Sequence, residues 1–365
     1  MCVIGRGMAM ELDFYRDKRV LITGHTGFKG SWMCAVLAEH GAHVLGYSLE
    51  PPTEPNLFEM LCIPGKMDSR TGDVRNRQCL LETFKEFKPE IVIHMAAQPI
   101  VRESYMNPAY TYEVNVMGTV NVLEAIRCTA SVKSAVIVTT DKVYKNKEWI
   151  WGYREDEELN GFDPYSNSKS CAELVTDSYR NSYFKGQRVA VSTVRAGNVI
   201  GGGDFAIDRI IPDCYRAASS GCDIVVRNPY STRPYQHVLE PIMAYLKIAA
   251  KQYKNFELAS AYNIGPDIEG CLTTGTLANL FCESWNRIFN DSVKHVEGID
   301  EGALHEANCL KLDNSKYKSV FGWKTTWDIE ETIKRTVTLY AAIYNHEDIR
   351  ACMRRQIADF EKEYM

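Results

Sequence analysis

The chain has 365 residues, of which 45% are hydrophobic and 24% are charged, a composition typical of a globular protein and not of a disordered one. Its 42 basic and 47 acidic residues give a formal net charge of −5 without long charged runs, which argues against bulk binding to nucleic acid or anionic membranes. No stretch approaches the ~18 consecutive apolar residues of a membrane span. The N-terminal apolar run is too short for a secretory signal. We therefore expect a cytoplasmic globular protein, with residues 1–11 as an extension.

The first half of the chain alternates short β-branched apolar runs with segments of helical pattern. Strands are expected at 19–24, 43–47, 90–95, 134–139 and 189–194, and helices at about 30–40, 111–128 and 165–184. Near-continuous apolar strands separated by helices predict a parallel sheet covered on both faces. The expected fold class is α/β with a doubly wound (Rossmann) sheet, which binds ligands at the carboxyl ends of its strands.

The pattern changes after about Gly197. The glycine-rich stretch 201–204 and the prolines 212, 229, 234, 241 and 266 predict a smaller C-terminal α/β lobe that binds the substrate. We assign 12–195 and about 238–265 to the sheet domain, and about 196–237 and 266–365 to the second lobe. Without a flexible linker, the two are expected to pack tightly around a cleft.

A glycine-rich turn follows the first expected strand: Gly24-His25-Thr26-Gly27-Phe28-Lys29-Gly30. Glycines there let the backbone bend and approach a pyrophosphate, while the helix N-terminus offers free N–H groups. Between a first strand and a first helix, this triplet predicts a dinucleotide-binding turn. For His25 and Lys29 two interpretations stay open, namely exposed turn residues or, for Lys29, a position near a cofactor phosphate.

Acidic residues follow the next expected strands. Glu50 is placed to bind the adenosine ribose hydroxyls and to repel a 2′-phosphate, which favours NAD over NADP, although Ser48 would tolerate that phosphate. Asp73, which precedes Val74 and a helical pattern, contacts the adenine amino group or caps the helix.

A phenol and an ammonium group lie four residues apart, on one helix face, in Tyr165 and Lys169. A nearby cation stabilises phenolate and moves the pKa of tyrosine from ~10 towards that of a general base. Thr140 ends the preceding strand, where an open sheet places catalytic groups. The following Asp141 and Lys142 supply a second acid–base pair, or a solvated loop pair if they do not face the site.

The second lobe carries several arginines suited to the phosphate groups of a ligand, because guanidinium groups match phosphate oxygens. Arg209, Arg227 and Arg233 are the candidates, together with Asn198 at a strand end, and surface ion pairs are the alternative for each arginine. Asn263 is expected to be structural.

Several motifs resemble the extended short-chain dehydrogenases/reductases, over about residues 12 to 330. They are Gly24-x-x-Gly27-x-x-Gly30, His94-Met-Ala96-Ala97-Gln98-Pro99, Thr140-Asp141-Lys142-Val-Tyr144, Tyr165-x-x-x-Lys169 and Arg195-Ala-Gly-Asn198-Val-Ile-Gly201. Gly24 to Ser31, Thr140 to Asn146 and Arg233 to Pro241 narrow the resemblance to nucleotide-sugar 4,6-dehydratases that use CDP-sugars. Related dTDP-sugar dehydratases have glutamate in place of Lys142. Tyr235 and Phe205 stand where the family has tryptophan.

The resemblance implies NAD as the cofactor and CDP-glucose as the small-molecule substrate, in deoxysugar and surface-polysaccharide biosynthesis. The implied cofactor-binding residues are Gly24, Thr26, Gly27, Phe28, Lys29, Gly30, Glu50, Asp73, Val74, Ala96, Ala97, Gln98, Asn115, Tyr165 and Lys169. The implied substrate-binding residues are Gln98, Asn198, Arg209, Arg227 and Arg233. Asn115 is also expected to bond to the backbone near the site.

The implied mechanism divides the labour among five residues. Tyr165, helped by Lys169, takes the proton of the sugar 4-hydroxyl, which Thr140 aligns. Lys142, as a neutral amine, removes the C5 proton, and protonated Asp141 donates to the departing 6-hydroxyl. These roles need opposite pKa shifts in Lys142 and Asp141.

Three other functions remain as alternatives: another dehydratase acting on dTDP- or GDP-sugars, a nucleotide-sugar 4-epimerase, and a non-catalytic dinucleotide sensor. An epimerase needs no Asp141-Lys142 pair, and a sensor would be expected to lose Tyr165 or Lys169.

The 12 cysteines show no Cys-x-x-Cys spacing, and Cys34, Cys79, Cys171 and Cys282 are expected to be small hydrophobes in apolar surroundings. The histidines show no ligand spacing, so no metal site is predicted. The helices at 111–128 and 165–184 are long enough for a four-helix interface in a homodimer or homotetramer, or their apolar faces pack on their own sheet.

Overall fold

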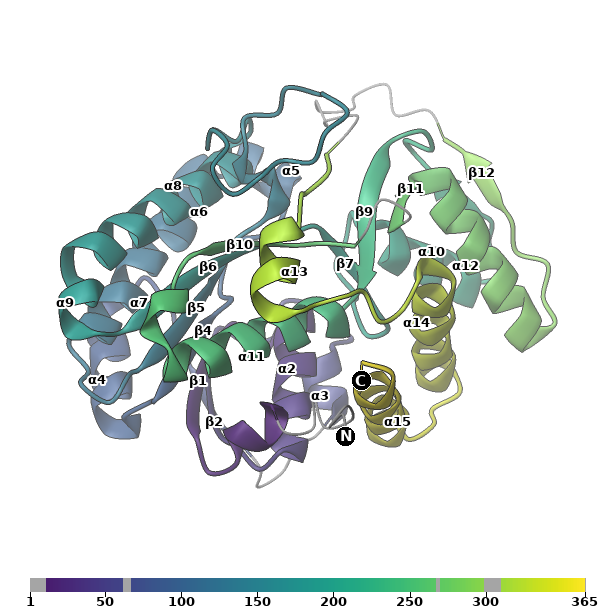
Figure 1. The fold of residues 1–365 in the computed structure, drawn as a ribbon. Helices are drawn as coiled ribbons and strands as arrows, with labels where there is room; N and C mark the ends of the chain where they lie inside the picture. The colour runs from purple at the N-terminus through teal and green to yellow at the C-terminus, as the bar shows by residue number, and fades with distance from the viewer. Residues whose placement is uncertain (1–10, 62–66, 267–269, 299–309, 365) are drawn as a thin grey trace, which may run out of the picture.

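The computed structural model describes residues 11–61, 67–266, 270–298 and 310–364 (Figure 1). Its main sheet has seven parallel strands in the order β10-β6-β5-β4-β1-β2-β3. The strands are β1 (Arg19–Thr23), β2 (His43–Ser48), β3 (Met67–Thr71), β4 (Ile91–His94), β5 (Ser134–Val138), β6 (Ala190–Ala196) and β10 (Ala261–Ile264). The expected doubly wound α/β fold is confirmed.

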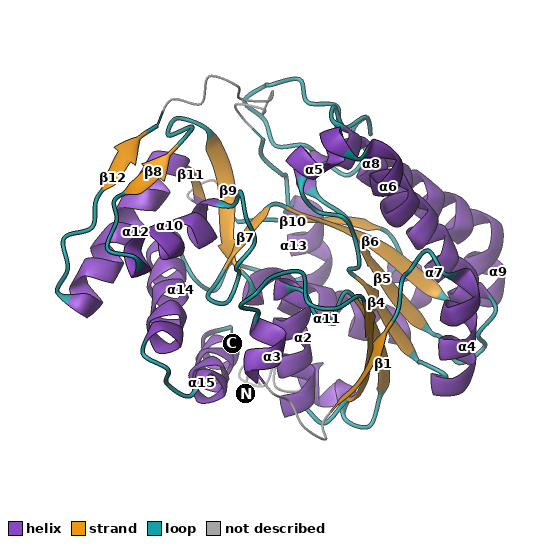
Figure 2. Cartoon of the chain, turned by 180° about the vertical axis from the view of Figure 1, so that it is seen from behind, coloured by secondary structure: helices purple, strands orange, loops and turns teal. Residues whose placement is uncertain are grey.

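Alternate side chains of the strands feed two separate cores. In β1, Val20 and Ile22 pack with Trp32 on one face, while Leu21 packs with Phe84 on the other. Helices α2 (Phe28–Glu39) and α11 (Leu239–Lys254) cover the first face, and α4 (Arg77–Phe87), α7 (Gly118–Arg127) and α8 (Pro164–Tyr179) cover the second (Figure 2). Because both faces are buried, the strands read as continuous apolar runs.

The edge strand β3 was missed by the sequence-based expectations. Its residues are partly buried or exposed, and it carries Asp68 and Arg70 instead of an apolar run. An edge strand with charged residues gives no buried-strand pattern.

Two expected helices are each interrupted by a π-helical segment. The segment expected at 111–128 begins earlier, as α6 (Pro108–Tyr112), and passes through a π-helical turn at Glu113–Met117 into α7. The segment expected at 165–184 is α8, whose N-cap Asp163 accepts from the Ser166 N–H, followed by a π-helical turn at Arg180–Phe184 and by α9 (Lys185–Gln187).

The second half adds two small sheets and several helices. One sheet has the order β11 (Cys271–Thr273), β9 (Thr232–His237), β7 (Asn198–Ile200), and the other pairs β8 (Ile224–Val226) with β12 (His295–Glu297). The remaining helices are α3 (Leu57–Leu61), α5 (Val101–Met106), α10 (Ile210–Ser219), α12 (Thr274–Phe289), α13 (Ser315–Phe321), α14 (Ile329–Tyr344) and α15 (Ile349–Glu363). The lobe boundaries proposed from the sequence stay a prediction.

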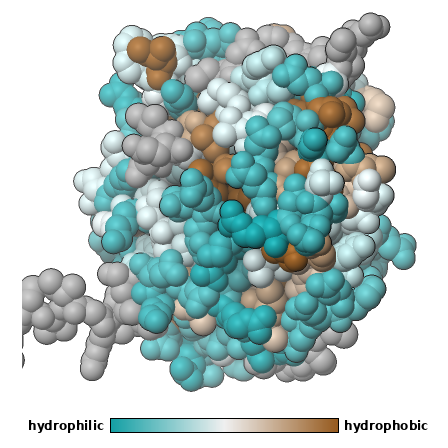
Figure 3. Space-filling model, turned by 90° about the vertical axis from the view of Figure 1, so that its right-hand side faces the viewer, coloured by the Kyte–Doolittle hydropathy of each residue, from teal (hydrophilic) through white to brown (hydrophobic). Residues whose placement is uncertain are grey.

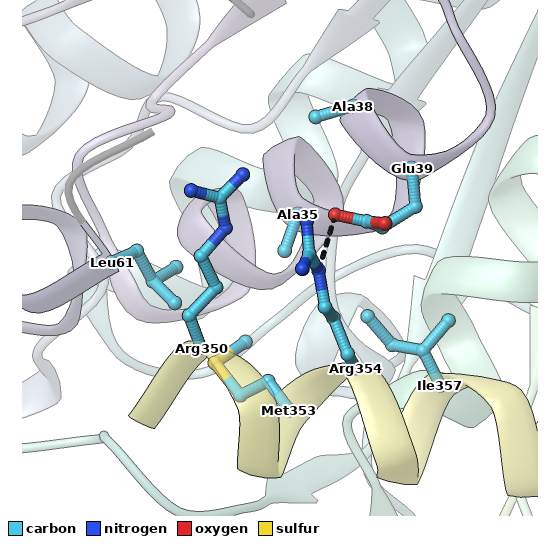
Figure 4. Close-up of a pocket in the computed structure, with 8 residues that line it drawn as sticks. All are labelled: Ala35, Ala38, Glu39, Leu61, Arg350, Met353, Arg354 and Ile357. Carbon is cyan, nitrogen blue, oxygen red and sulfur yellow. Dashed lines mark hydrogen bonds and ion pairs between the residues drawn. The ribbon is translucent and has the colours of Figure 1, made fainter. Parts of the chain in front are cut away.

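The C-terminal helix α15 packs back onto the helices of the main sheet. Arg354 pairs with Glu39 of α2 at 2.9 Å, beside a small apolar pocket that Leu61 of α3 also lines (Figure 4). The pocket holds about 10 Å³, which is no more than one water molecule needs. We therefore interpret it as a packing gap between helices.

The face shown in Figure 3 is mostly hydrophilic, with scattered hydrophobic residues. No described helix is long and apolar enough to cross a membrane.

The burial of the cysteines agrees with the sequence-based expectation except at one position. Cys34 and Cys282 are buried as expected, and Cys171 is half-buried. The expectation for Cys79 is wrong, because it lies exposed in the first turn of α4.

Candidate active site

The glycine-rich turn brings two stretches of backbone into direct contact. Gly24 has a φ of +78°, and a Cβ there would lie 2.7 Å from the backbone nitrogen of Ala96, in the loop after β4. A Cβ on Gly30 would lie 2.2 Å from the carbonyl oxygen of Gly24. The N-cap of α2, Gly27, has no capping side chain. A tight turn with the free N–H groups of a helix N-terminus fits a dinucleotide pyrophosphate.

His25 and Lys29, the two residues of the turn with open interpretations, lie in different surroundings. His25 is fully buried, so the interpretation as an exposed turn residue is wrong for it; its Nε2 lies 2.7 Å from Ser69 Oγ. Burial lowers the pKa of His25 to about 4. Lys29 lines the large cavity described below, where burial, reinforced by Arg209, lowers its pKa to about 8 against the attraction of Asp141 and Asp204.

The other residues expected at the adenosine end have partners within the chain. Thr26 Oγ1 lies 2.9 Å from Ser48 Oγ and 3.0 Å from the Leu49 carbonyl oxygen. Exposed Glu50 accepts a 2.9 Å hydrogen bond from Thr71. Val74 is 4% exposed and belongs to the core beside the sheet.

Asp73 is held by Arg75 and does not cap α4. Its carboxylate accepts from the Arg75 backbone N–H at 2.8 Å and from the Arg75 side chain at 2.7 Å. The N-cap of α4 is Asn76, whose Oδ1 accepts from the Cys79 N–H. The capping alternative for Asp73 is therefore wrong.

The loop after β4 is fixed from behind by Asn115. Its Oδ1 accepts from the Gln98 N–H at 2.8 Å, and its Nδ2 donates to the Gln98 carbonyl and to Ser168. The expectation that Asn115 bonds to backbone is confirmed. The Gln98 amide bonds to the Ile100 backbone and to Thr111, and Gln98 does not line the large cavity. The structure therefore keeps Gln98 apart from the other expected substrate residues.

A cavity of about 530 Å³ lies at the carboxyl ends of the strands and is shared with the second half of the chain. Four of the five expected catalytic residues line it: Thr140, Asp141, Lys142 and Tyr165. Residues from the segment after β5 and from α8, α10, β7 and β9 thus surround one space, as expected for ligand binding in a doubly wound sheet.

Tyr165 and Lys169 lie one turn apart on α8, and of the two only Tyr165 lines the cavity. Lys169 is 5% exposed, and its Nζ donates to the Val138 carbonyl at 3.3 Å. Burial, reinforced by Lys29, lowers the pKa of Lys169 to about 7, and Glu173 opposes this shift. Burial raises the pKa of Tyr165 to about 12, a shift that its hydrogen bond with Thr140 opposes and Asp141 reinforces. The expected downward shift of this pKa is therefore wrong, because burial outweighs the effect of nearby charges.

Asp141 is a buried acid that lines the cavity. It is 2% exposed, and burial raises the pKa of its carboxyl despite the opposing effects of Lys142, Thr140 and Arg233. The neighbouring Lys142 lines the same cavity and is partly exposed. The two side chains therefore face one space, and the interpretation as a solvated loop pair is wrong for Asp141.

The expected substrate-binding residues of the second half all line the cavity: Asn198, Arg209, Arg227 and Arg233. The arginines have partners there. Arg209 pairs with Asp204 at 3.1 Å, Arg227 pairs with Asp208 at 2.9 Å and with Asp213 at 3.3 Å, and Arg233 donates to its neighbour's carbonyl at 3.0 Å.

Apart from Asp141, the acidic residues of this cavity were not predicted from the sequence. Asp204, Asp208 and Asp213 line it together with Arg102, which lies 3.8 Å from Asp208. Asp204 directly follows the glycine-rich stretch 201–203, which marked the start of a loop but gave no sign of an ion pair.

The fold and the site define an extended short-chain dehydrogenase/reductase. A family model described as GDP-mannose 4,6 dehydratase matches residues 21–336. CDP-glucose 4,6-dehydratase of Salmonella typhimurium is 45% identical over 357 residues, covering 96% of this chain and 98% of that protein. The chain therefore belongs to the nucleotide-sugar 4,6-dehydratase family of these enzymes.

Solved structures share the fold. UDP-glucose 4-epimerase of Thermus thermophilus, in complex with NAD, has a TM-score of 0.75 at 22% identity, covering 88% of this chain and 99% of that one. dTDP-glucose 4,6-dehydratase of Bacillus anthracis, in complex with NAD, has a TM-score of 0.72 at 20% identity, covering 91% and 99%. Folds of this kind thus bind NAD in the solved relatives.

Proposed function

We propose that this chain is an NAD-dependent CDP-glucose 4,6-dehydratase, a hydro-lyase that converts CDP-D-glucose to CDP-4-keto-6-deoxy-D-glucose. The observation that carries the proposal is the near full-length similarity to the Salmonella typhimurium CDP-glucose 4,6-dehydratase, in a chain whose Asp141, Lys142 and Tyr165 face one cavity. Oxidation of an alcohol alone needs only the tyrosine and its lysine. The added acid and amine fit a second proton transfer, which elimination of water requires.

The chemistry that NAD would supply is reversible hydride transfer, from C4 of the sugar and back to C6. The glycine-rich turn would hold its pyrophosphate, and Glu50 and Asp73 would lie at the adenosine end, which favours NAD over NADP. Lys29, which belongs to this turn, also lines the cavity, where its charge would be available to a phosphate.

The chain's own residues would perform the proton transfers. Tyr165 takes the proton of the 4-hydroxyl, which the Thr140 hydroxyl aligns. Lys142 takes the C5 proton, which the 4-ketone makes acidic, and returns it at the end. Asp141 gives its proton to the departing 6-hydroxyl, for which its raised pKa is favourable. Arg209, Arg227 and Arg233 would bind the pyrophosphate of CDP-glucose, with Asn198 beside them.

The test is a comparison of CDP-, dTDP-, UDP- and GDP-hexoses as substrates of the purified chain. We expect CDP-glucose to be consumed fastest and its product to have lost one water by mass spectrometry. A product of unchanged mass would identify a 4-epimerase, and preference for a dTDP- or GDP-sugar would assign another dehydratase.

We also infer a homodimer or homotetramer, assembled through α6, α7 and α8. Met117, Leu174 and Tyr183, in the segment around these helices, are 52%, 56% and 46% exposed. Large exposed hydrophobic side chains on neighbouring helices favour a protein contact. The expected cytoplasmic location stays a prediction.

A further inference from the structure

A buried ion pair joins α8 and β6, next to Thr139 at the carboxyl end of β5. Arg195 Nη2 of β6 lies 2.9 Å from Glu173 Oε2 of α8, and both side chains are 3% exposed. Glu173 Oε1 accepts a 2.5 Å hydrogen bond from Thr139, and Oε2 accepts a 2.7 Å hydrogen bond from Thr193. Three donors, from β6 and from the residue after β5, therefore converge on one carboxylate of α8.

Glu173 lies between the two elements that carry the catalytic residues, namely α8 and the end of β5. It follows Lys169 by four residues and Tyr165 by eight, so the three side chains leave α8 on one face. Its partner Thr139 directly precedes Thr140. The hydrogen bond between Glu173 and Thr139 thus ties the helix of Tyr165 and Lys169 to the strand end that carries Thr140.

The charge of Glu173 also acts on Lys169. Burial and Lys29 both disfavour the ammonium form of Lys169, and Glu173 favours it. His94 on β4 adds no second positive charge beside Lys169, because burial and the charge of Lys169 lower its pKa to about 3 and keep it neutral. Among the groups of the described residues whose charge acts on Lys169, Glu173 is the one that stabilises the cation.

Glu173 itself is kept ionised by its partners. Burial raises the pKa of its carboxyl, but Arg195, Thr139 and Thr193 lower it more, so the net shift is downward. A buried ion pair is by itself weak evidence for stability, since desolvation offsets much of the attraction. A full set of donors around a carboxylate next to a buried lysine needs a further explanation.

We propose that Glu173 is a positioning residue for hydride transfer: its carboxylate fixes α8 against the ends of β5 and β6 and supplies the counter-charge of the Lys169 ammonium. The inference rests on the proposed function only through the roles of Tyr165 and Lys169. A positively charged Lys169 stabilises the phenolate of Tyr165, and removal of the counter-charge would leave Lys169 neutral over more of the working pH range.

The decisive experiment is the titration of Lys169 in Glu173→Gln. The protein is labelled in its lysine side chains, and the Lys169 signal, assigned with Lys169→Arg, is followed by NMR against pH without substrate. We expect the midpoint to fall by at least about one pH unit relative to the parent. The alkaline limb of kcat should move in the same direction, with about tenfold lower kcat at pH 8 and a KM changed less than about twofold. An unchanged Lys169 midpoint would overturn the proposal.

Thr193→Val is the matched control, since it removes one hydrogen bond to the same carboxylate and leaves the charge. A purely structural role predicts equal behaviour of both variants, whereas we expect the Lys169 midpoint to stay at the parental value in Thr193→Val. If Glu173→Gln does not fold, Glu173→Gln/Arg195→Met removes both charges together, and the same lower midpoint is expected. Because the titration uses no substrate, it is independent of whether the parent turns over CDP-glucose, which tests the proposed function separately.

Discussion

The Thr140 hydroxyl donates a 2.9 Å hydrogen bond to Asp141 Oδ1, at the carboxyl end of β5. The other carboxyl oxygen, Oδ2, is buried and has no hydrogen-bond partner among the described residues. Thr140 therefore orients the acid while one oxygen remains available to a ligand in the cavity. A buried polar atom without a partner is costly, so a hydrogen bond from a bound substrate to this oxygen would be favourable.

Asp141→Asn tests the proposed role of Asp141 as an acid. The amide matches the carboxyl in shape but has no proton to give to a leaving hydroxyl, so we expect turnover of CDP-glucose to fall at least about 100-fold. The first oxidation needs no acid, and reduced cofactor should therefore accumulate in a single turnover, measurable by its absorbance. Turnover at the parental rate would contradict the assignment.

Lys142→Ala and Tyr165→Phe separate the two proton abstractions. We expect Lys142→Ala to oxidise C4 but to lose dehydration, and Tyr165→Phe to lose both, each by about 100-fold or more. Rapid-quench mass spectrometry with parallel cofactor absorbance distinguishes the outcomes. Dehydration that survives in Lys142→Ala but not in Tyr165→Phe would remove Lys142 from the mechanism.

Gly46→Ala tests the packing beneath the glycine-rich turn. A Cβ on Gly46 would lie 2.2 Å from the His25 ring, so the buried imidazole must move. We expect a loss of about 1–3 kcal/mol in the free energy of unfolding, measured by denaturant titration. Gly186→Ala is the control, since nothing lies within 4 Å of that Cβ, and it should leave stability unchanged or raise it by about 0.4–1 kcal/mol.

Glu240→Gln tests a buried carboxyl at the start of α11. Its Oε1 accepts from the N–H groups of Thr326 and Trp327, and burial, opposed by these two bonds, raises its pKa to about 8. A carboxyl whose pKa is higher in the folded state than in the unfolded state stabilises the folded state fully below the unfolded pKa of ~4.3. This stabilisation is lost as the pH rises through the folded pKa.

The glutamine variant cannot ionise, so its stability relative to the parent should grow from about pH 4.5 to pH 8, by at most about 1.4 kcal/mol per pH unit, and then level off. Unfolding curves of both proteins at a series of pH values give this difference. A difference that is independent of pH would show that Glu240 does not titrate in this range.

Leu174→Glu tests the proposed subunit contact. A charge on the exposed face of α8 should dissociate the oligomer, as measured by light scattering coupled to size-exclusion chromatography. Ile288→Glu on α12 is the control, because Ile288 is also exposed, at 44%, but lies in the second half of the chain. Equal effects of the two substitutions would exclude α8 as the specific interface.

Much of the fold could be predicted because the information is local. The strand β5 and the turn from Gly24 to Gly30 carry their signals within a few residues, as an apolar run and as glycine spacing. The strand β3 carries none, since Asp68 and Arg70 stand at an exposed sheet edge.

The candidate site divides in the same way. Tyr165 and Lys169 are related by helical spacing, which a sequence shows directly. The pairing of Glu173 with Arg195, 22 residues later, depends on how α8 packs on β6, and nothing in either sequence segment indicates it. The amide of Gln98 was expected at the substrate, but its orientation depends on Ile100 and Thr111 in the folded loop.

The ion pairs of the cavity determine which partners a phosphate group must replace when it binds to the arginines. Arg209 and Arg227 are bound to Asp204, Asp208 and Asp213 before a nucleotide sugar arrives. A pyrophosphate would therefore exchange one anion for another instead of neutralising unpaired cations. Such a site selects its ligand by the geometry of the phosphate oxygens, because simple attraction between opposite charges is already satisfied.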